Sequence, residues 1–351
     1  MTNHDVVAIG ASAGGFQALR ELVRGLPGDF PAALLVTIHL HPEASKVLPD
    51  LVDRAGPLPA GFAADGEEIA PGGIYIAPPD LHLLVDEGRV MLRRGPRENG
   101  ARPAIDPMFR SVAVNYGSRA VGVILSGRLN DGSSGLHAIK RCGGIAVVQD
   151  PRDAQYPDMP TSALASTPVD HVVRLDEIAA LLSRLAAQAA RPGPPPPADL
   201  RREVSIAAQR DSSMGGNDEL GERSLLTCPE CHGLLWEIKD GGLVRYRCHV
   251  GHAFTLEALE AEQATELDRA LASALRALNE RIHVVRRLAE EARKRQQDRM
   301  VRRWDSRLQE YERQAAVIRG ALMAKLPENG EQRPDEVELA EAQQRRAAKR
   351  D

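Results

Sequence analysis

The first 188 residues predict an α/β fold: a doubly wound, mainly parallel sheet with helices on both faces. Apolar runs that end in Gly, Pro or polar residues are typical of buried strands, namely VVAIG, ALLVTIHL, GIYIAPP, VGVILSG and GIAVVQD. Amphipathic segments follow two of them, FQALRELVRGL and GLHAIKRC. Alternation of strands and helices along a chain favours a parallel sheet.

Two strands of this region differ from the others. The segment HLLVDEGRVMLRR contains two short apolar stretches around Glu87 and Gly88. A two-residue turn that ends in Gly is typical of a β-hairpin. We therefore expect an antiparallel hairpin inside the α/β domain.

Composition divides the remaining chain into four regions. Residues 189–224, with GPPPP and SSMGGND, predict a flexible linker that is stiff at its start. Residues 225–254 predict a small zinc-ribbon-like module, and residues 327–351 a charged, disordered tail. Residues 255–326 predict a region of long helices or coiled coil, from leucines at helical spacing: Leu256, Leu259, Leu267, Leu271, Leu275 and Leu278.

Bulk properties exclude several classes of function. The net charge of −4 argues against a broad nucleic-acid-binding surface. The start, MTNHDVVAIG, lacks the basic region and the long apolar stretch of a signal peptide. No apolar run approaches the roughly 20 residues of a membrane helix. We therefore expect a cytoplasmic protein that neither inserts into membranes nor binds nucleic acid.

A candidate nucleophile follows the first predicted strand. Gly10 to Gly14 match the pattern G-x-S-x-G, which places Ser12 on a sharp turn between a strand and a helix. Amides at the start of that helix can stabilise an oxyanion. A glycine-rich turn without chemistry explains the motif alone about equally well. Dinucleotide binding ranks lower, because glycine is missing where Ser12 stands.

A base and an orienting acid end two further strands. His39 closes the second strand, and Asp131 follows the run VGVILSG. Carboxyl ends of parallel strands meet at one sheet edge, so both should lie near Ser12. His41 is a weaker candidate because Pro42 ends the strand. Each residue has a structural alternative, His39 as a polar strand end and Asp131 as a turn residue or helix N-cap.

Five segments of the chain together resemble a known family. GASAGG, IHLHP, IYIAPPDLHLLV, RPAIDPMFRSVA and VGVILSGRLNDGSSGL are together similar to the CheB-type chemotaxis protein-glutamate methylesterase catalytic domain, over about residues 4–185. The resemblance implies hydrolysis of glutamate methyl esters on chemoreceptor helices, with release of methanol, and deamidation of glutamines. It assigns the nucleophile to Ser12, the base to His39 and the aspartate to Asp131, and oxyanion contacts to the backbone near Ala13 and Arg128.

The chain also departs from that family. The family's usual form has an N-terminal receiver domain, for which this sequence leaves no room, so control by receiver phosphorylation is expected to be absent. The loop GRLNDG replaces the Met-Gly pair that usually precedes the Asn. The C-terminal half has no counterpart in the chemotaxis enzyme, so the substrate receptor and pathway stay open.

The cysteines predict a metal site rather than disulfides. Cys228 and Cys231 form a C-x-x-C pair, and Cys248 precedes His249 and His252. Such spacing is typical of a structural zinc site. The segment LLWEIKDGGLVRYR, which lies between Cys231 and Cys248, predicts a hairpin. His252 is favoured over His249 as the fourth ligand, because adjacent residues chelate one ion poorly. Cys142 should be buried at a helix end.

The sequence therefore predicts a serine methylesterase and glutaminase that needs no catalytic cofactor and carries structural zinc. Its expected partners are methylated chemoreceptor-like proteins, with a counterpart methyltransferase and self-association through the helices. The alternative is a catalytically weak esterase-like scaffold that acts through its zinc ribbon and coiled coil in a signalling complex.

Overall fold

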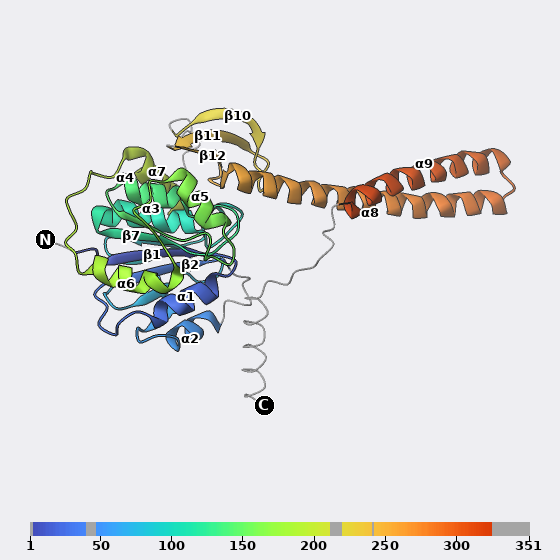
Figure 1. Cartoon of the computed structure of the whole chain (residues 1–351). Coiled ribbons are helices and arrows are strands. Elements are labelled where there is room, and N and C mark those ends of the chain that lie inside the picture. Colours follow the sequence, from blue (N-terminus) through green and yellow to red (C-terminus); the bar gives the residue numbers. More distant parts are fainter. Residues whose placement is uncertain (1–2, 40–46, 211–219, 241, 325–351) are drawn as a thin grey trace. The chain divides into compact units, whose positions relative to one another are not determined.

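The computed structural model describes residues 3–39, 47–210, 220–240 and 242–324 (Figure 1). Contacts between Cα atoms divide the described chain into two compact units. One contains the residues up to Leu259, and the other begins at Glu260. None of the described helices combines the length and the hydropathy of a membrane span.

The first unit is built around a seven-stranded sheet in which every neighbouring pair is parallel. Its order is β3 (Ala60–Phe62), β4 (Ile74–Ile76), β2 (Ala33–Ile38), β1 (Val6–Ala11), β7 (Ala120–Ile124), β8 (Ile145–Gln149) and β9 (His171–Val173). The chain proceeds from β1 towards β2 and later returns to the other side of β1. This topology confirms the predicted doubly wound α/β fold, a fold in which ligands usually bind beyond the carboxyl ends of the strands where the strand order reverses, here at β1.

Helices cover both faces of this sheet (Figure 1). One face carries α1 (Gly15–Arg24), α2 (Leu48–Asp53) and α6 (Leu175–Ala186). The other carries α3 (Ile105–Tyr116), α4 (Ser133–Arg141) and α5 (Asp158–Ser166), and a 3-10 turn (Gly117–Arg119) follows α3.

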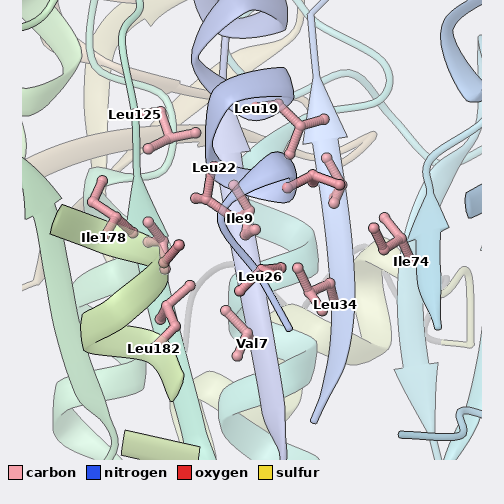
Figure 2. Close-up of a cluster of buried hydrophobic side chains, with 14 of the residues drawn as sticks. Val7, Ile9, Leu19, Leu22, Leu26, Leu34, Ile74, Leu125, Ile178 and Leu182 are labelled. Carbon is pink, nitrogen blue, oxygen red and sulfur yellow. The ribbon is translucent and has the colours of Figure 1, made fainter. Parts of the chain in front are cut away.

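Alternation along β1 divides the core into two layers. Val7 and Ile9 point to one face, where Figure 2 shows them among Leu19, Leu22, Ile178 and Leu182. Val6 and Ala8 point to the opposite face and pack with Phe109 and Leu136. Both faces are apolar, which is why the strands read as continuous apolar runs.

The predicted hairpin is confirmed as β5 (His82–Asp86) and β6 (Arg89–Arg93), which pair antiparallel outside the main sheet. Glu87 and Gly88 have φ angles of 47° and 77°. Positive φ at both turn residues is the geometry that fits the twist of a two-residue hairpin.

The expectation of a flexible linker over residues 189–224 is wrong for its middle part. Residues Ala198–Ala207 form helix α7, which packs with buried Leu200, Glu203 and Ala207 against α3 and the hairpin. The segment ADLRREVSIA consists mostly of helix-forming residues, and Pro197 immediately precedes it. Residues 211–219 of the expected linker lie outside the described residues.

A four-stranded antiparallel sheet follows, of β10 (Glu222–Thr227), β11 (Leu234–Asp240), β12 (Leu243–Cys248) and β13 (Ala253–Thr255). We call residues 222–255 the ribbon. Asp240 pairs with Leu243, which confirms the hairpin predicted between Cys231 and Cys248.

Two long helices, α8 (Leu256–Lys294) and α9 (Asp298–Met323), confirm the expected helical region. Ile282 and Val285 of α8 pack against Tyr311 and Ala315 of α9. The leucine stripe is only partly buried, since Leu267 is 51% exposed. The predicted tail, 327–351, lies outside the described residues.

Candidate active site and metal site

Ser12 lies on the turn between β1 and α1. Its N–H donates to the carbonyl of Ser126 (3.0 Å), and its own carbonyl accepts from Gly15 N (2.9 Å). Gly14 is the N-cap of α1, with a φ of 71°. A Cβ there would lie 2.7 Å from Ser126 Oγ, so the turn requires glycine. This strand-turn-helix geometry is the one that the G-x-S-x-G motif predicts.

Ser126 fixes this turn, and sequence reasoning did not single it out. Its hydroxyl donates to the carbonyl of Ala13 (2.8 Å) and accepts from Tyr156 N (2.9 Å). Its N–H donates to Gln149 Oε1 (3.0 Å). The only signal in the sequence is its position at the end of the strand VGVILSG. Ser126 therefore ties the Ser12 turn to the end of β8.

His39 and Asp131 lie together, as the topology predicts. His39 Nε2 is 2.8 Å from Asp131 Oδ2, and the side chains are 19% and 3% exposed. His39 N donates to the carbonyl of Ala11 (3.2 Å), so the histidine directly follows the last pairing of β2 with β1. The imidazole thus faces a buried carboxylate at the sheet edge that carries Ser12.

The carboxylate of Asp131 accepts further hydrogen bonds. Ile105 N (2.7 Å) and Asp106 N (3.2 Å) donate from the first turn of α3, and Asn99 Nδ2 donates to Oδ1 (2.9 Å). Burial raises the pKa of Asp131, but the hydrogen bond and charge of His39, with the Ile105 and Asn99 hydrogen bonds, lower it to about 2. The alternative of Asp131 as a helix N-cap is wrong, because Ala104 and Gly132 hold the N-cap positions of α3 and α4. Its carboxylate instead accepts from the first amides of α3 and pairs with His39.

A second buried carboxylate, Asp106, lies beside Asp131 and was missed as a site residue. Asn99 Nδ2 bridges the two, 3.1 Å from Asp106 Oδ2, and Gly135 N donates to Oδ1 (2.6 Å). Burial and the charge of Asp131 raise the pKa of Asp106 to about 7. The motif RPAIDP contains this residue, but its spacing alone does not reveal the pairing.

The contact between Ser12 and His39 is less complete. Ala11 and Ile38 are paired in register, so Ser12 and His39 follow on adjacent strands. No hydrogen bond joins the two side chains among the described residues. Such catalytic hydrogen bonds are often long before substrate binds. Asp131 lies against Nε2 of the imidazole. His41 lies outside the described residues.

The expected oxyanion region flanks Ser12. Within the described residues the N–H of Ala13, which precedes the N-cap Gly14, donates no backbone hydrogen bond. The guanidinium of Arg128 stacks over the Tyr156 ring, 5.0 Å from its centre. Arg128 and Leu129 are exposed on the loop before Asp131.

The predicted metal ligands converge at one end of the ribbon. One ligand atom each from Cys228, Cys231, Cys248 and His252 lie within 4.8 Å of one another. Cys231 Sγ is 3.5 Å from Cys248 Sγ, and His252 Nδ1 is 3.5 Å from Cys248 Sγ. Two Sγ atoms bound to one zinc at about 2.3 Å would lie about 3.8 Å apart, so the donor set fits a tetrahedral ion. His249 is exposed and outside this group.

The thiols have opposite tendencies to ionise. A hydrogen bond from Cys228 lowers the pKa of Cys248 to about 3, whereas the pKa of Cys228 is raised. Cys142 is separate: it caps α4 and is fully buried, as expected, and burial raises its pKa to about 11.

Comparison with known proteins covers the α/β domain. The model of the family "CheB methylesterase" matches residues 7–182. A Leptospira interrogans protein, provisionally named a protein-glutamate methylesterase/protein-glutamine glutaminase, is 36% identical over 184 residues, which are 52% of this chain and 95% of that protein. "Protein-glutamate methylesterase/protein-glutamine glutaminase 4" of Myxococcus xanthus is 40% identical over 183 residues, 52% of each chain.

A solved structure agrees with these relatives. The crystal structure of the Thermotoga maritima CheB methylesterase catalytic domain superposes with a TM-score of 0.50 at 33% sequence identity, covering 53% of this chain and 99% of that one. The matched residues, 7–182, include Ser12 with its motif and nearly all of the seven-stranded parallel sheet. The chain therefore belongs to the CheB methylesterase family.

Proposed function

We propose that this protein is a protein-glutamate methylesterase and protein-glutamine glutaminase, with Ser12, His39 and Asp131 as its catalytic triad. The observation that carries the proposal is the 2.8 Å contact between His39 and Asp131 at the strand ends that also present Ser12. Family membership and the names of the relatives support the substrate class.

In the first half-reaction the Ser12 hydroxyl attacks the γ-carbonyl carbon of a glutamate methyl ester, and His39 takes its proton. The tetrahedral oxyanion accepts hydrogen bonds from backbone amides near Ala13. When the intermediate collapses, the imidazolium returns the proton to the leaving oxygen, and methanol departs. Asp131 stays ionised and stabilises the imidazolium.

In the second half-reaction water hydrolyses the acyl-enzyme. His39 removes one proton from the water as its oxygen attacks the ester on Ser12, and then protonates the departing Ser12 oxygen. The product is a glutamate carboxylate. With a glutamine side chain the leaving group is ammonia and the later steps are the same.

Ser12→Ala tests this function. The variant should lose methanol release from a methylated receptor domain by at least about 1,000-fold, because no nucleophile remains. Ser183→Ala on α6, away from the sheet edge, serves as the matched control. Near-wild-type turnover by Ser12→Ala would exclude Ser12 as the nucleophile, whereas a wild type that releases no methanol would favour the alternative, a catalytically weak esterase-like scaffold.

We further propose that Cys228, Cys231, Cys248 and His252 hold one structural zinc ion. Four protein ligands close a tetrahedral site and leave no position for substrate, so the ion would stabilise the ribbon and take no part in hydrolysis. Zinc content of the purified protein, measured by elemental analysis, should be one per chain. His252→Ala should lower it and His249→Ala should not. The opposite pattern would assign the fourth ligand to His249.

The proposed partners are methylated helical receptors, with a methyltransferase that supplies the ester.

We also propose functional boundaries of 1–188 for the esterase, 225–254 for the metal module and 255–326 for the helices, which provide a surface for self-association.

A further inference from the structure

We propose that the ribbon positions the triad aspartate, and that Thr255 at its last strand is a positioning residue for the esterase reaction. This inference rests on the proposed function. It concerns β13 and the first turn of α8, all within the unit that contains the sheet.

The first connection runs through Asn99. Its backbone N–H donates to the carbonyl of Ala253 (2.8 Å), and its side-chain Oδ1 accepts from Thr255 N (3.0 Å). The other end of the same amide donates to Asp131 Oδ1 (2.9 Å). Asn99 has a φ of 51°, a conformation that asparagine tolerates better than most residues. One side chain thus joins the ribbon backbone to the catalytic carboxylate.

The second connection runs through Asn130, the neighbour of Asp131 in sequence. Thr255 Oγ1 donates to Asn130 Oδ1 (2.6 Å), and Asn130 Nδ2 donates to Glu257 Oε2. Asn130 and Thr255 are each 1% exposed. Both polar ends of the Asn130 side chain are therefore held by residues beyond the esterase domain.

A buried charge cluster anchors the ribbon beside these contacts. Glu98, next to Asn99, forms ion pairs with Arg110 of α3 and with Arg247 of β12, the latter at 3.0 Å. Arg247 Nη1 also donates to the carbonyl of Gly251 (2.9 Å), in the turn between Cys248 and His252. The turn that carries two proposed metal ligands is thus linked through Arg247 and Glu98 to the residue that holds Asp131.

This arrangement predicts a defined kinetic effect. Asp131 keeps the imidazole oriented only if its carboxylate is held, and Thr255 of the ribbon contacts both Asn99, which donates to that carboxylate, and Asn130, which precedes Asp131. Outer hydrogen-bond partners of this kind typically change activity by roughly 10–100-fold. Because these residues act through Asp131 and not on the ester itself, their loss should lower kcat and leave KM nearly unchanged.

The test compares Thr255→Val with Thr255→Ser in the full chain. Valine keeps the shape but leaves Asn130 Oδ1 without its donor, so kcat for methanol release should fall by roughly 10-fold or more. Serine restores the hydroxyl and should restore kcat. The hydroxyl also accepts from Ala258 N (3.3 Å), so the urea midpoint and zinc content of each variant are measured alongside.

Glu257→Ala provides an independent variant at an exposed position, should Thr255→Val fail to fold. It should lower kcat with unchanged KM, zinc content and urea midpoint. Wild-type kcat in Thr255→Val or in a correctly folded Glu257→Ala would overturn the proposal. So would a loss of kcat in Thr255→Val that Thr255→Ser does not restore.

A second readout separates this inference from the proposed function. A fluorophosphonate probe labels an activated serine whatever its natural substrate, and Ser12→Ala provides the blank. If wild-type protein labels at Ser12 but releases no methanol, the substrate assignment fails, and the labelling rates of the Thr255 variants still decide the positioning role. Equal labelling rates in wild type and Thr255→Val would overturn that role.

Discussion

At the scale of single residues, Asp131 combines two tasks that usually belong to different carboxylates. It accepts from the first amides of α3 and from Asn99, and it also pairs with His39. Ionisation of Asp131 is therefore stabilised by fixed donors that persist when the imidazole moves. Its lowered pKa, about 2, means that this stabilisation is present above pH 4 and is lost as the pH falls towards 2.

Asp131→Asn tests the catalytic half of this role. The amide can still accept one hydrogen bond, but it cannot stabilise an imidazolium, so kcat should fall on the order of 10³–10⁴-fold. Methanol release under saturating substrate measures the change. Asp176→Asn on the exposed side of α6 should leave kcat unaltered. A loss of less than 10-fold in Asp131→Asn would remove Asp131 from the triad.

Asp106 gives a prediction with the opposite sign. Its pKa is raised to about 7, so native protein holds a proton there between about pH 4 and 7 that unfolded protein has released. The contribution of Asp106 to folding stability is complete below pH 4 and declines as the pH rises through 7. Infrared difference spectra against Asp106→Asn should show a protonated carboxyl at pH 5.5 that disappears above pH 8. Absence of that band at pH 5.5 would show that the carboxyl is ionised.

The sequence predicts which polar residues follow the strands, but it does not predict which other side chains these residues contact. Ser12, His39 and Asp131 each follow an apolar run, and parallel topology brings such ends together. Asn99 and Asp106 lie before and within a helix on one face of the sheet, and only the folded chain brings them to Asp131. No periodicity in the sequence encodes that approach.

At the scale of elements, the turn that carries Ser12 depends on a close approach by the loop after β7. A Cβ at Gly127 would lie 2.0 Å from Met159 Sδ and 3.0 Å from Ser12 Cβ. Met159 is fully buried, so its side chain has little free space into which to move. The close approach of this loop to Ser12 therefore favours glycine at position 127.

Gly127→Ala should accordingly destabilise the fold by about 1–3 kcal/mol, the usual cost of overpacking, and slow the labelling of Ser12. Urea denaturation and the fluorophosphonate rate measure the two effects. Gly61→Ala on β3 is the matched control, because an added Cβ there meets nothing within 4 Å. Equal stability of the two variants would contradict the close approach.

The predictability of elements followed their length and burial. The long apolar strands and the hairpin at Glu87 and Gly88 were predicted because burial on both faces, or a two-residue turn, leaves a clear pattern. Strands β3 and β9 have three residues each, which is too short for a pattern that would predict them. Helix α7 lies between a Pro-rich and a Gly-rich segment. These segments predict a linker, although most of the ten residues of α7 favour a helix.

At the scale of the first unit, five buried charged side chains join parts of the chain that are distant in sequence. Glu98, Arg110, Glu203, Arg245 and Arg247 come from the loop after β6, from α3, from α7 and from β12. The three arginines and two glutamates are each no more than 3% exposed. Buried ion pairs add little net stability over an apolar core, but loss of one partner leaves an uncompensated charge.

Glu98→Gln should therefore destabilise this unit by about 3–5 kcal/mol, since Arg110 and Arg247 lose one of the two carboxylates that they share and Glu203 alone is left to balance three buried guanidinium groups. Glu68→Gln is a matched control: its ion pair with Arg89 spans 3.6 Å with side chains 77% and 57% exposed, so its loss should change stability by less than about 1 kcal/mol. Urea midpoints at pH 7 measure both. Because Glu98 adjoins Asn99, the destabilised variant should also label Ser12 more slowly, and a normal labelling rate would mean that docking of the ribbon and the geometry of the triad are independent.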